Sequence, residues 1–197
     1  MSSYPIPYVS TRTRTGERTS DIYSRLLADR ILYLGTPIDD GVANTVIAQL
    51  IHLESDSPEA PVSLYLNSPG GSTTAMLAIY DAMQFVRPPV HTTCVGQVVA
   101  NAAVLLAAGA QGHRQILPHG RVVLHQPAAE GHRGTIPDLI LEADEVERTR
   151  TLLESVLARH TGRTAQQVRA DTERDLVLTA EGALDYGIVD AVLEYRS

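Results

Sequence analysis

The sequence predicts an α/β fold in which helices cover a mostly parallel sheet. β-prone apolar runs alternate with segments whose apolar residues recur every three or four positions. Turns rich in glycine, proline or aspartate separate several of these segments. The chain has 197 residues, of which 44% are hydrophobic and 20% are charged, which is enough for one domain with a buried core.

The first half of the chain predicts an arm followed by alternating strands and helices. Residues 1–19 contain no apolar run, so we expect either a flexible arm or an extended hairpin there, with the globular domain over 20–197. Ser20 is expected to cap a short helix over 21–30. The expected buried strands are 31–35, 62–66, 90–95 and 121–124. Apolar stripes predict two intervening helices, with Val42, Val46, Leu50 and Leu53 on the first and Met76, Ile79, Tyr80 and Met83 on the second. We expect Ser72 to cap the second of these helices, and a third, built of small residues, to begin at Asn101.

A long helix is expected in the second half of the chain. It should begin at Pro137, which suits the first helical position, and run to about His160, where Gly162 ends it. Its expected apolar face comprises Leu139, Ala143, Val146, Leu153 and Leu157. A helix of this length spans roughly 35 Å, so it should extend beyond the core. Its charged surface fits either a solvated helix or an oligomerisation arm. A short helix over 180–187 and a strand over 188–193 complete the chain.

Composition and charge exclude several classes of protein. The net charge of −7 argues against a surface that binds nucleic acid. The most apolar segment, 98–110, is too short to span a bilayer, and no signal-peptide pattern begins the chain. Cys94 is the only cysteine and cannot form an internal disulfide, so we expect a buried core residue and a cytoplasmic protein without membrane association.

Two strand-to-helix junctions carry candidate chemistry. In "NSPGG" (67–71) two glycines follow a strand, although this motif alone also fits a plain turn and lacks the lysine of a phosphate loop. A second junction lies between Gly96 and Asn101. Backbone N–H groups from two such junctions can hold an oxyanion, and each donor stabilises an acyl-transfer transition state by about 3–4 kcal/mol.

A histidine and an acidic motif complete the candidate residues. His125 ends a β-prone run, so we expect it at a sheet edge facing a cleft. In "DTERD" (171–175) either Asp171 or Asp175 could orient a histidine, and spacing does not choose between them. A solvated charge cluster is the alternative. No pair of histidines has the spacing of metal ligands, so we expect neither a metal nor another cofactor.

Taken together, these blocks resemble the proteolytic subunit of the ATP-dependent Clp protease, and most closely its actinobacterial type. The resemblance covers residues 16–196 and includes "LYLNSPGG", "CVGQ", "VLLAAGA", "LHQP", "DTERD" and "LTAEGALDYGIVDAVLEYR". It implies a crotonase-like fold of repeated βαβ units with a protruding handle over about 125–160. It also implies rings of seven subunits that stack through the handles into a tetradecamer and enclose a chamber for unfolded polypeptide. An AAA+ unfoldase would dock outside and supply the ATP.

The resemblance also implies residue roles. It assigns the base to His125, the orienting acid to Asp175, the oxyanion N–H groups to Gly71 and Asn101, and the unfoldase contact to Tyr65, Phe85 and Leu193. The nucleophile position belongs to a "GQAAS" pattern, which reads "GQVVA" here and leaves Ala100 in place of serine.

The resemblance implies a serine endopeptidase. The alanine at position 100 predicts that this chain is inactive, because a methyl group cannot attack a carbonyl. An engineered substitution that traps substrate is one explanation. The other is a naturally non-catalytic subunit in mixed rings with paralogues. Further departures at Val98, Val99 and Asn101 favour the second explanation, whereas the intact His125 and Asp175 weigh against it. An acyl-CoA enzyme of the crotonase type is a remote alternative, because no CoA site or suitable glutamate is visible.

Overall fold

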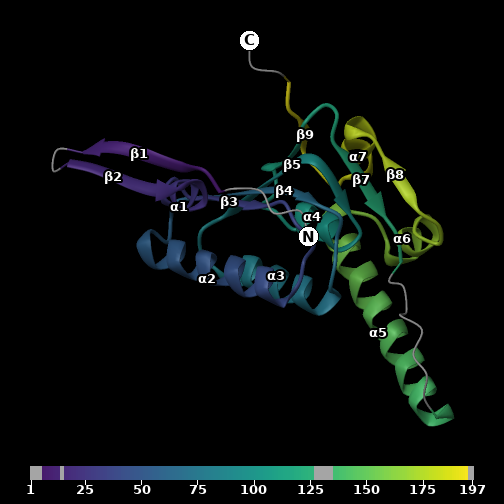
Figure 1. The fold of residues 1–197 in the computed structure, drawn as a ribbon. Helices are drawn as coiled ribbons and strands as arrows, with labels where there is room; N and C mark the ends of the chain where they lie inside the picture. The colour runs from purple at the N-terminus through teal and green to yellow at the C-terminus, as the bar shows by residue number, and fades with distance from the viewer. Residues whose placement is uncertain (1–5, 14–15, 127–134, 195–197) are drawn as a thin grey trace.

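A computed structural model describes residues 6–13, 16–126 and 135–194, and within these residues it shows a seven-stranded sheet and a separate hairpin (Figure 1). Five parallel strands lie side by side in the order β3 (Ile31–Leu34), β4 (Val62–Ser68), β5 (Val90–Val99), β6 (Arg114–Ile116) and β9 (Ala191–Val192). Strand β7 (Arg121–Leu124) pairs in parallel with β5, and β8 (Leu176–Leu178) pairs antiparallel with β7. The predicted α/β fold with a mostly parallel sheet is confirmed.

Strand β5 is longer than predicted, and its two parts pair with different strands on the same side. Its first part pairs with β6, and Gln97–Val99 pairs with Arg121–Val123 of β7. Gly96 lies between the two parts with φ 101°, and a Cβ there would lie 2.8 Å from Asn67 Oδ1. The glycine therefore lets the strand change neighbours. The sequence predicted this strand only as far as Val95.

Three helices connect the successive parallel strands. They are α2 (Asp40–Asp56), α3 (Thr73–Phe85) and α4 (Asn101–Ala107). Ser72 caps α3 as predicted, because its hydroxyl accepts a hydrogen bond from the Ala75 N–H at 3.3 Å. The predicted apolar faces of α2 and α3 are buried in large part, and every residue of α4 is buried.

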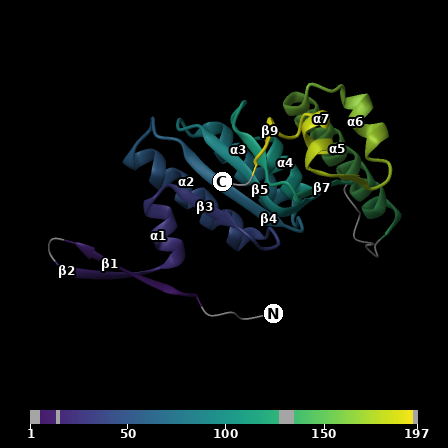
Figure 2. The same ribbon diagram turned by 90° about the horizontal axis from the view of Figure 1, so that it is seen from above.

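The N-terminal arm is an extended hairpin within the described residues. Strands β1 (Tyr8–Thr13) and β2 (Gly16–Asp21) pair antiparallel and project from the body beside α1 (Ile22–Ala28) (Figure 2). The prediction that Ser20 caps α1 is wrong. Asp21 is the cap, and its Oδ1 accepts from the Ser24 N–H at 2.9 Å, because β2 continues through Ser20.

The C-terminal helices gather beside β7, at the other end of the sheet (Figure 2). They are α5 (Ile136–Thr161), α6 (Ala165–Asp171) and α7 (Ala180–Tyr186). Pro137 is the second helical residue of α5, not the first, and Gly162 ends the helix as predicted. None of the helices in the described part of the chain is both long and apolar enough to cross a membrane.

Only the C-terminal half of α5 packs against the core, and its N-terminal half projects from the body (Figure 1). Leu153 and Leu157 are buried as predicted, but Leu139 and Ala143 are exposed. The expectation of one continuous buried face is therefore wrong for the first half, since no element among the described residues covers it. Residues 127–134 of the expected handle lie outside the described residues.

Arg114 ties the C-terminal ends of three helices together. Its buried guanidinium donates to the carbonyls of Ala107 at the end of α4 (3.3 Å), His160 near the end of α5 (2.7 Å) and Gly187 after α7 (3.0 Å). Its Nε also donates to Asp190 at 2.9 Å. These carbonyls have no partner inside their helices, so one side chain satisfies three of them.

Candidate active site

Three segments with candidate chemistry meet at one edge of the sheet. In the parallel register, Ser68 of β4 lies opposite Val98 of β5, and Val99 lies opposite Val123 of β7. The carboxyl ends of these strands therefore share one edge. The glycine turn follows β4, Ala100 follows β5, and His125 follows β7.

Ala100 forms a sharp turn between β5 and α4. Its φ of 49° and ψ of −112° lie in a region that non-glycine residues rarely adopt, at a cost of about 1–3 kcal/mol. Its N–H donates to the Val123 carbonyl at 2.8 Å, and its carbonyl accepts from the Ala103 N–H at 3.0 Å. A strained strand-to-helix turn of this kind presents the nucleophile in many hydrolases. The backbone of such a turn is present here, with a methyl group at its tip.

The glycine turn lies directly against Ala100. A Cβ on Gly70 would lie 2.7 Å from the Val99 carbonyl oxygen and 3.6 Å from the Ala100 Cβ, so only glycine allows this approach. Gly71 pairs with Ile38 in an isolated parallel β-bridge. The Ile38 N–H donates to the Gly70 carbonyl, and the Ser72 N–H donates to the Ile38 carbonyl. In such a bridge, the N–H and carbonyl of the central residue point to the opposite side. The Gly71 carbonyl faces α4, where the Asn101 side chain binds it.

Asn101 links the glycine turn to the start of α4. Its side-chain amide donates to the Gly71 carbonyl at 2.6 Å and to Thr73 Oγ1 at 3.1 Å, and the residue is buried. Sequence reasoning assigned Asn101 only a backbone role. The side-chain link joins residues 30 positions apart, and no local pattern indicates it.

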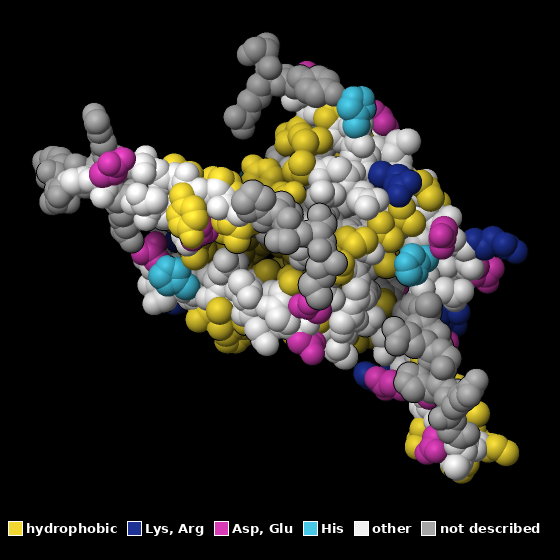
Figure 3. Space-filling model, in the orientation of Figure 1, with side chains coloured by type: hydrophobic (Ala, Val, Ile, Leu, Met, Phe, Trp, Pro, Cys, Tyr) yellow, Lys and Arg dark blue, Asp and Glu magenta, His cyan; other side chains and the backbone are white. Residues whose placement is uncertain are grey.

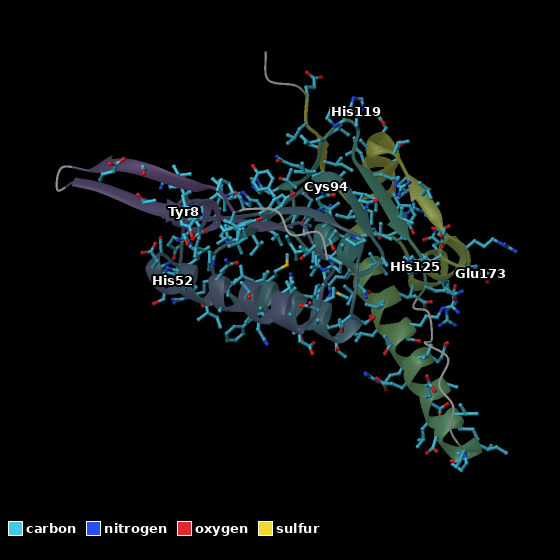
Figure 4. The ribbon with its side chains drawn as sticks, in the orientation of Figure 1. Tyr8, His52, Cys94, His119, His125 and Glu173 are labelled. Carbon is cyan, nitrogen blue, oxygen red and sulfur yellow. The ribbon has the colours of Figure 1, made fainter. Side chains whose placement is uncertain are left out.

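His125 is half-buried where β7 ends, near the top of α5 (Figure 4). It follows the last residue of β7 and lines a cavity of about 20 Å³ together with Ala100 and Asn101. Arg150 and Glu154 of α5 line the same cavity, and sequence reasoning missed both. The volume suits about one water molecule. His125 Nδ1 lies 2.8 Å from the Gln126 carbonyl oxygen, with which it makes a hydrogen bond.

The strand register distinguishes the two aspartates that spacing left open. Leu124 pairs with Leu176 in the antiparallel β7–β8 ladder, so one further step sets Asp175 opposite His125. Side chains at such positions have Cβ atoms about 5 Å apart. Asp171 instead accepts a hydrogen bond from the Tyr186 hydroxyl at 3.0 Å. The register therefore favours Asp175 as the neighbour of His125, but the ladder ends at Leu124, Asp175 is exposed, and the His125 Nδ1 hydrogen bond goes to the Gln126 carbonyl.

The two serines beside the glycine turn hold the backbone. The buried Ser68 hydroxyl donates to the Thr36 carbonyl at 2.7 Å and accepts from the Gly70 N–H at 3.2 Å. The Ser72 hydroxyl caps α3. Neither hydroxyl is therefore poised to replace a nucleophile at position 100.

Two of the three residues expected to contact an unfoldase come together. Tyr65 and Leu193 line one cavity of about 620 Å³ on the sheet. Phe85 lies at the end of α3, where 84% of its surface is exposed, and it does not line this cavity.

The described residues hold no group of three or more histidine, cysteine, aspartate or glutamate side chains that could bind a metal. Cys94 lies within the sheet (Figure 4), and burial raises its pKa to about 12. Its thiol therefore stays protonated at neutral pH and is not a substitute nucleophile.

Comparisons with known proteins agree with this geometry. The family model described as Clp protease matches residues 14–196. The chain is 60% identical to ATP-dependent Clp protease proteolytic subunit 1 of Nocardia farcinica, over all of both chains. It is 57% identical to proteolytic subunit 4 of Rhodococcus jostii, over 98% of this chain and 99% of the relative. It is also 55% identical to proteolytic subunit 2 of Streptomyces avermitilis, over 100% of this chain and 98% of the relative. With its sheet, its projecting helix and its strained strand-to-helix turn, the chain belongs to the Clp protease family.

Proposed function

We propose that this chain is a Clp proteolytic subunit that does not itself cut peptide bonds. It contributes walls and docking surfaces to a barrel-shaped degradation chamber of stacked seven-membered rings. The observation that carries this proposal is Ala100, which occupies the strained turn at the centre of the candidate site.

The missing hydroxyl accounts for the inactivity. In a serine peptidase the serine oxygen attacks the carbonyl while a histidine accepts its proton. A methyl group has neither a lone pair nor a proton to give. Loss of the nucleophile in such an enzyme lowers turnover by about 10⁶, and the residual rate enhancement comes from binding and the oxyanion hole.

The other members of the site keep roles that follow from their placement. We assign the base to His125, its orienting acid to Asp175, and the oxyanion donors to the N–H groups of Gly71 and Asn101. Support comes from their convergence at one sheet edge and from the Asn101 side chain, which holds Gly71 against α4. This framework lacks the attacking atom, and in this structure His125 Nδ1 bonds to the Gln126 carbonyl instead of to Asp175.

The partners of the chain follow from the same proposal. Relatives named as subunits 1, 2 and 4 suggest that paralogues share one assembly, and such a paralogue would supply the nucleophile. The cavity at Tyr65 and Leu193 would receive an AAA+ unfoldase, which threads unfolded polypeptide into the chamber. We place the assembly in the cytoplasm.

The test is a peptidase assay of the purified chain on a short fluorogenic peptide, with and without a serine-directed fluorophosphonate. We expect no turnover above background and no covalent label. Robust turnover that the fluorophosphonate blocks would overturn the proposal. Adding the chain to a paralogous subunit that carries the serine should change the rate or mass of that subunit's complex, whereas an unchanged complex would contradict the mixed assembly.

A further inference from the structure

Two histidines from neighbouring strands stack face to face on the sheet. The rings of His91 and His113 have centroids 3.9 Å apart, and their planes lie within 6° of parallel. Thr92 of β5 lies opposite Arg114 of β6, and the Thr92 N–H donates to the His113 carbonyl at 3.1 Å. The histidine before each of these residues therefore occupies an equivalent place on the other face of the sheet. Sequence spacing predicted no pair of metal ligands, because the two histidines lie far apart in the chain.

The histidine pair lies on the face of the sheet opposite α4. Thr92 and Arg114 point toward α4, where the Thr92 hydroxyl donates to the Leu106 carbonyl at 2.8 Å and Arg114 donates to the Ala107 carbonyl at 3.3 Å. On the other face His91 is half-buried and His113 is exposed. Solvent and dissolved ions therefore reach the pair.

The charges around the pair suit a cation. Burial and the neighbouring His113 lower the pKa of His91, so its imidazole is neutral at neutral pH, and neutral imidazole is the form that binds metal. The residue opposite His91 on β4 is Ser63, which carries no charge. Arg114 follows His113 in the chain, but its guanidinium points to the other face and donates to the Asp190 carboxylate at 2.9 Å. No carboxylate or cation in these contacts has to be displaced by an arriving ion.

The spacing of the two rings fits a single metal ion. A tetrahedral zinc ion binds imidazole nitrogens at about 2.0–2.1 Å, which sets two such nitrogens about 3.4 Å apart. The ring separation of 3.9 Å is close to this value. Small rotations of the two side chains, of which that of His113 is exposed, bring one nitrogen of each ring to the ion. Water supplies the remaining ligands, as at zinc sites with an open position.

We propose that His91 and His113 form a binding site for a late first-row divalent metal ion, for which Zn²⁺ is the probe. Imidazole nitrogen suits zinc, copper and nickel, whereas Mg²⁺ and Ca²⁺ prefer oxygen ligands. Two residues further along the strands, Thr93 and Gln115 line the cavity of about 620 Å³ described above. A bound ion would therefore add positive charge to the face that carries this cavity. The inference requires neither peptidase chemistry nor a partner, so it is independent of the proposed function.

Other histidines of the chain lie singly and provide a matched control. In Figure 3 the histidine side chains lie apart from one another, and Figure 4 labels His52, His119 and His125 at these places in the same orientation. His52 is exposed on α2. His52→Gln therefore removes an accessible imidazole and leaves the pair intact.

The first test is isothermal titration calorimetry of the full chain, without a histidine tag, with Zn²⁺ near neutral pH and in excess Mg²⁺. We expect saturable binding of one ion per chain at the pair. His91→Gln and His113→Gln should each weaken this binding at least about tenfold, the effect typical of losing a group that holds a metal. His52→Gln should leave the dissociation constant unchanged. Excess Mg²⁺ should not compete, because the ligands are nitrogen atoms.

The second test counts the nitrogen ligands directly. Electron paramagnetic resonance of the chain with one equivalent of Cu²⁺ should show two imidazole nitrogens in the parent and in His52→Gln. Each variant of the pair should show fewer. At about pH 5, below the ordinary histidine pKa near 6.5, protons compete for the imidazoles and should release the ion.

Three results would contradict the inference. The first is a parent chain that shows no saturable Zn²⁺ binding. The second is binding that neither substitution at the pair weakens. The third is binding that only one of these substitutions weakens, which would indicate an adventitious ion on a lone imidazole. Circular dichroism and thermal unfolding of each variant confirm that the fold is intact. The peptidase assay is unaffected by any of these results.

Discussion

Replacing Ala100 with serine should give this chain peptidase activity. The new hydroxyl would extend from a turn that already has φ 49° and would enter the cavity of about 20 Å³ that His125 lines. Alanine already occupies this backbone, so the substitution adds no new strain. We expect a stability change within about 0.5 kcal/mol and an unchanged assembly.

The expected gain in rate follows from the geometry of His125. Loss of the serine from a Ser-His-Asp site costs about 10⁶ in turnover, and loss of the orienting aspartate costs about 10⁴. In the single chain, His125 Nδ1 bonds to the Gln126 carbonyl, so Asp175 does not orient the ring unless assembly brings the two side chains together. Ala100→Ser should therefore raise turnover by about 10²-fold, the quotient of the two factors. A gain that approaches about 10⁶ would show that assembly brings Asp175 to His125.

The assay is kcat/KM on a short fluorogenic peptide, together with covalent labelling by a fluorophosphonate. Ala100→Gly is the matched control, because it changes position 100 without adding a hydroxyl. Adding His125→Ala to the serine variant should abolish the gain. The reasoning is refuted if the serine variant folds and assembles like the parent chain yet is neither faster than the glycine variant nor labelled.

Three further predictions concern the framework around the site. Arg114→Met should lower the free energy of unfolding in urea by about 3–5 kcal/mol, because it leaves Asp190 and three helix-end carbonyls without their partner. A loss below about 1 kcal/mol would contradict this role. Hydrogen bonds from Arg114 lower the pKa of Asp190, so its contribution to stability is present above the unfolded value near 3.9 and is lost as pH falls further. Acid unfolding below about pH 4 should therefore be shallower in Asp190→Asn than in the parent chain, and identical slopes would argue against this linkage. Gly70→Ala should lower the free energy of unfolding by about 1–3 kcal/mol more than Gly112→Ala does, as measured by thermal unfolding. Both glycines have positive φ, but only at Gly70 would a Cβ meet another backbone segment. Equal losses for the two variants would show that this close approach is not the cause.

Features set by local periodicity could be predicted from the sequence. The apolar stripes of α2 and α3, the Ser72 cap and the Gly162 end of α5 each depend on residues within a turn or two of one another. The three-residue strands β6 and β8 were not predicted. Each has too few residues to show a period, and its strand conformation depends on neighbours distant in the chain.

The candidate site could be predicted only in part, for the same reason. Resemblance identified Ala100, His125, Asp175, Gly71 and Asn101, and the parallel topology explains why the ends of β4, β5 and β7 meet. Spacing alone did not choose between Asp171 and Asp175, and the β7–β8 register, which brings Leu176 opposite Leu124, lies outside what spacing contains. The Asn101 side-chain bond to Gly71 spans 30 residues and could not be foreseen.

The burial of Cys94 makes this protein convenient for fluorescence work. No other thiol exists in the chain, and this one stays protonated at neutral pH inside the sheet. A maleimide dye would therefore react with any cysteine introduced at the surface while the native residue is left in place. Donor and acceptor dyes on separate batches would then report subunit exchange by energy transfer in real time.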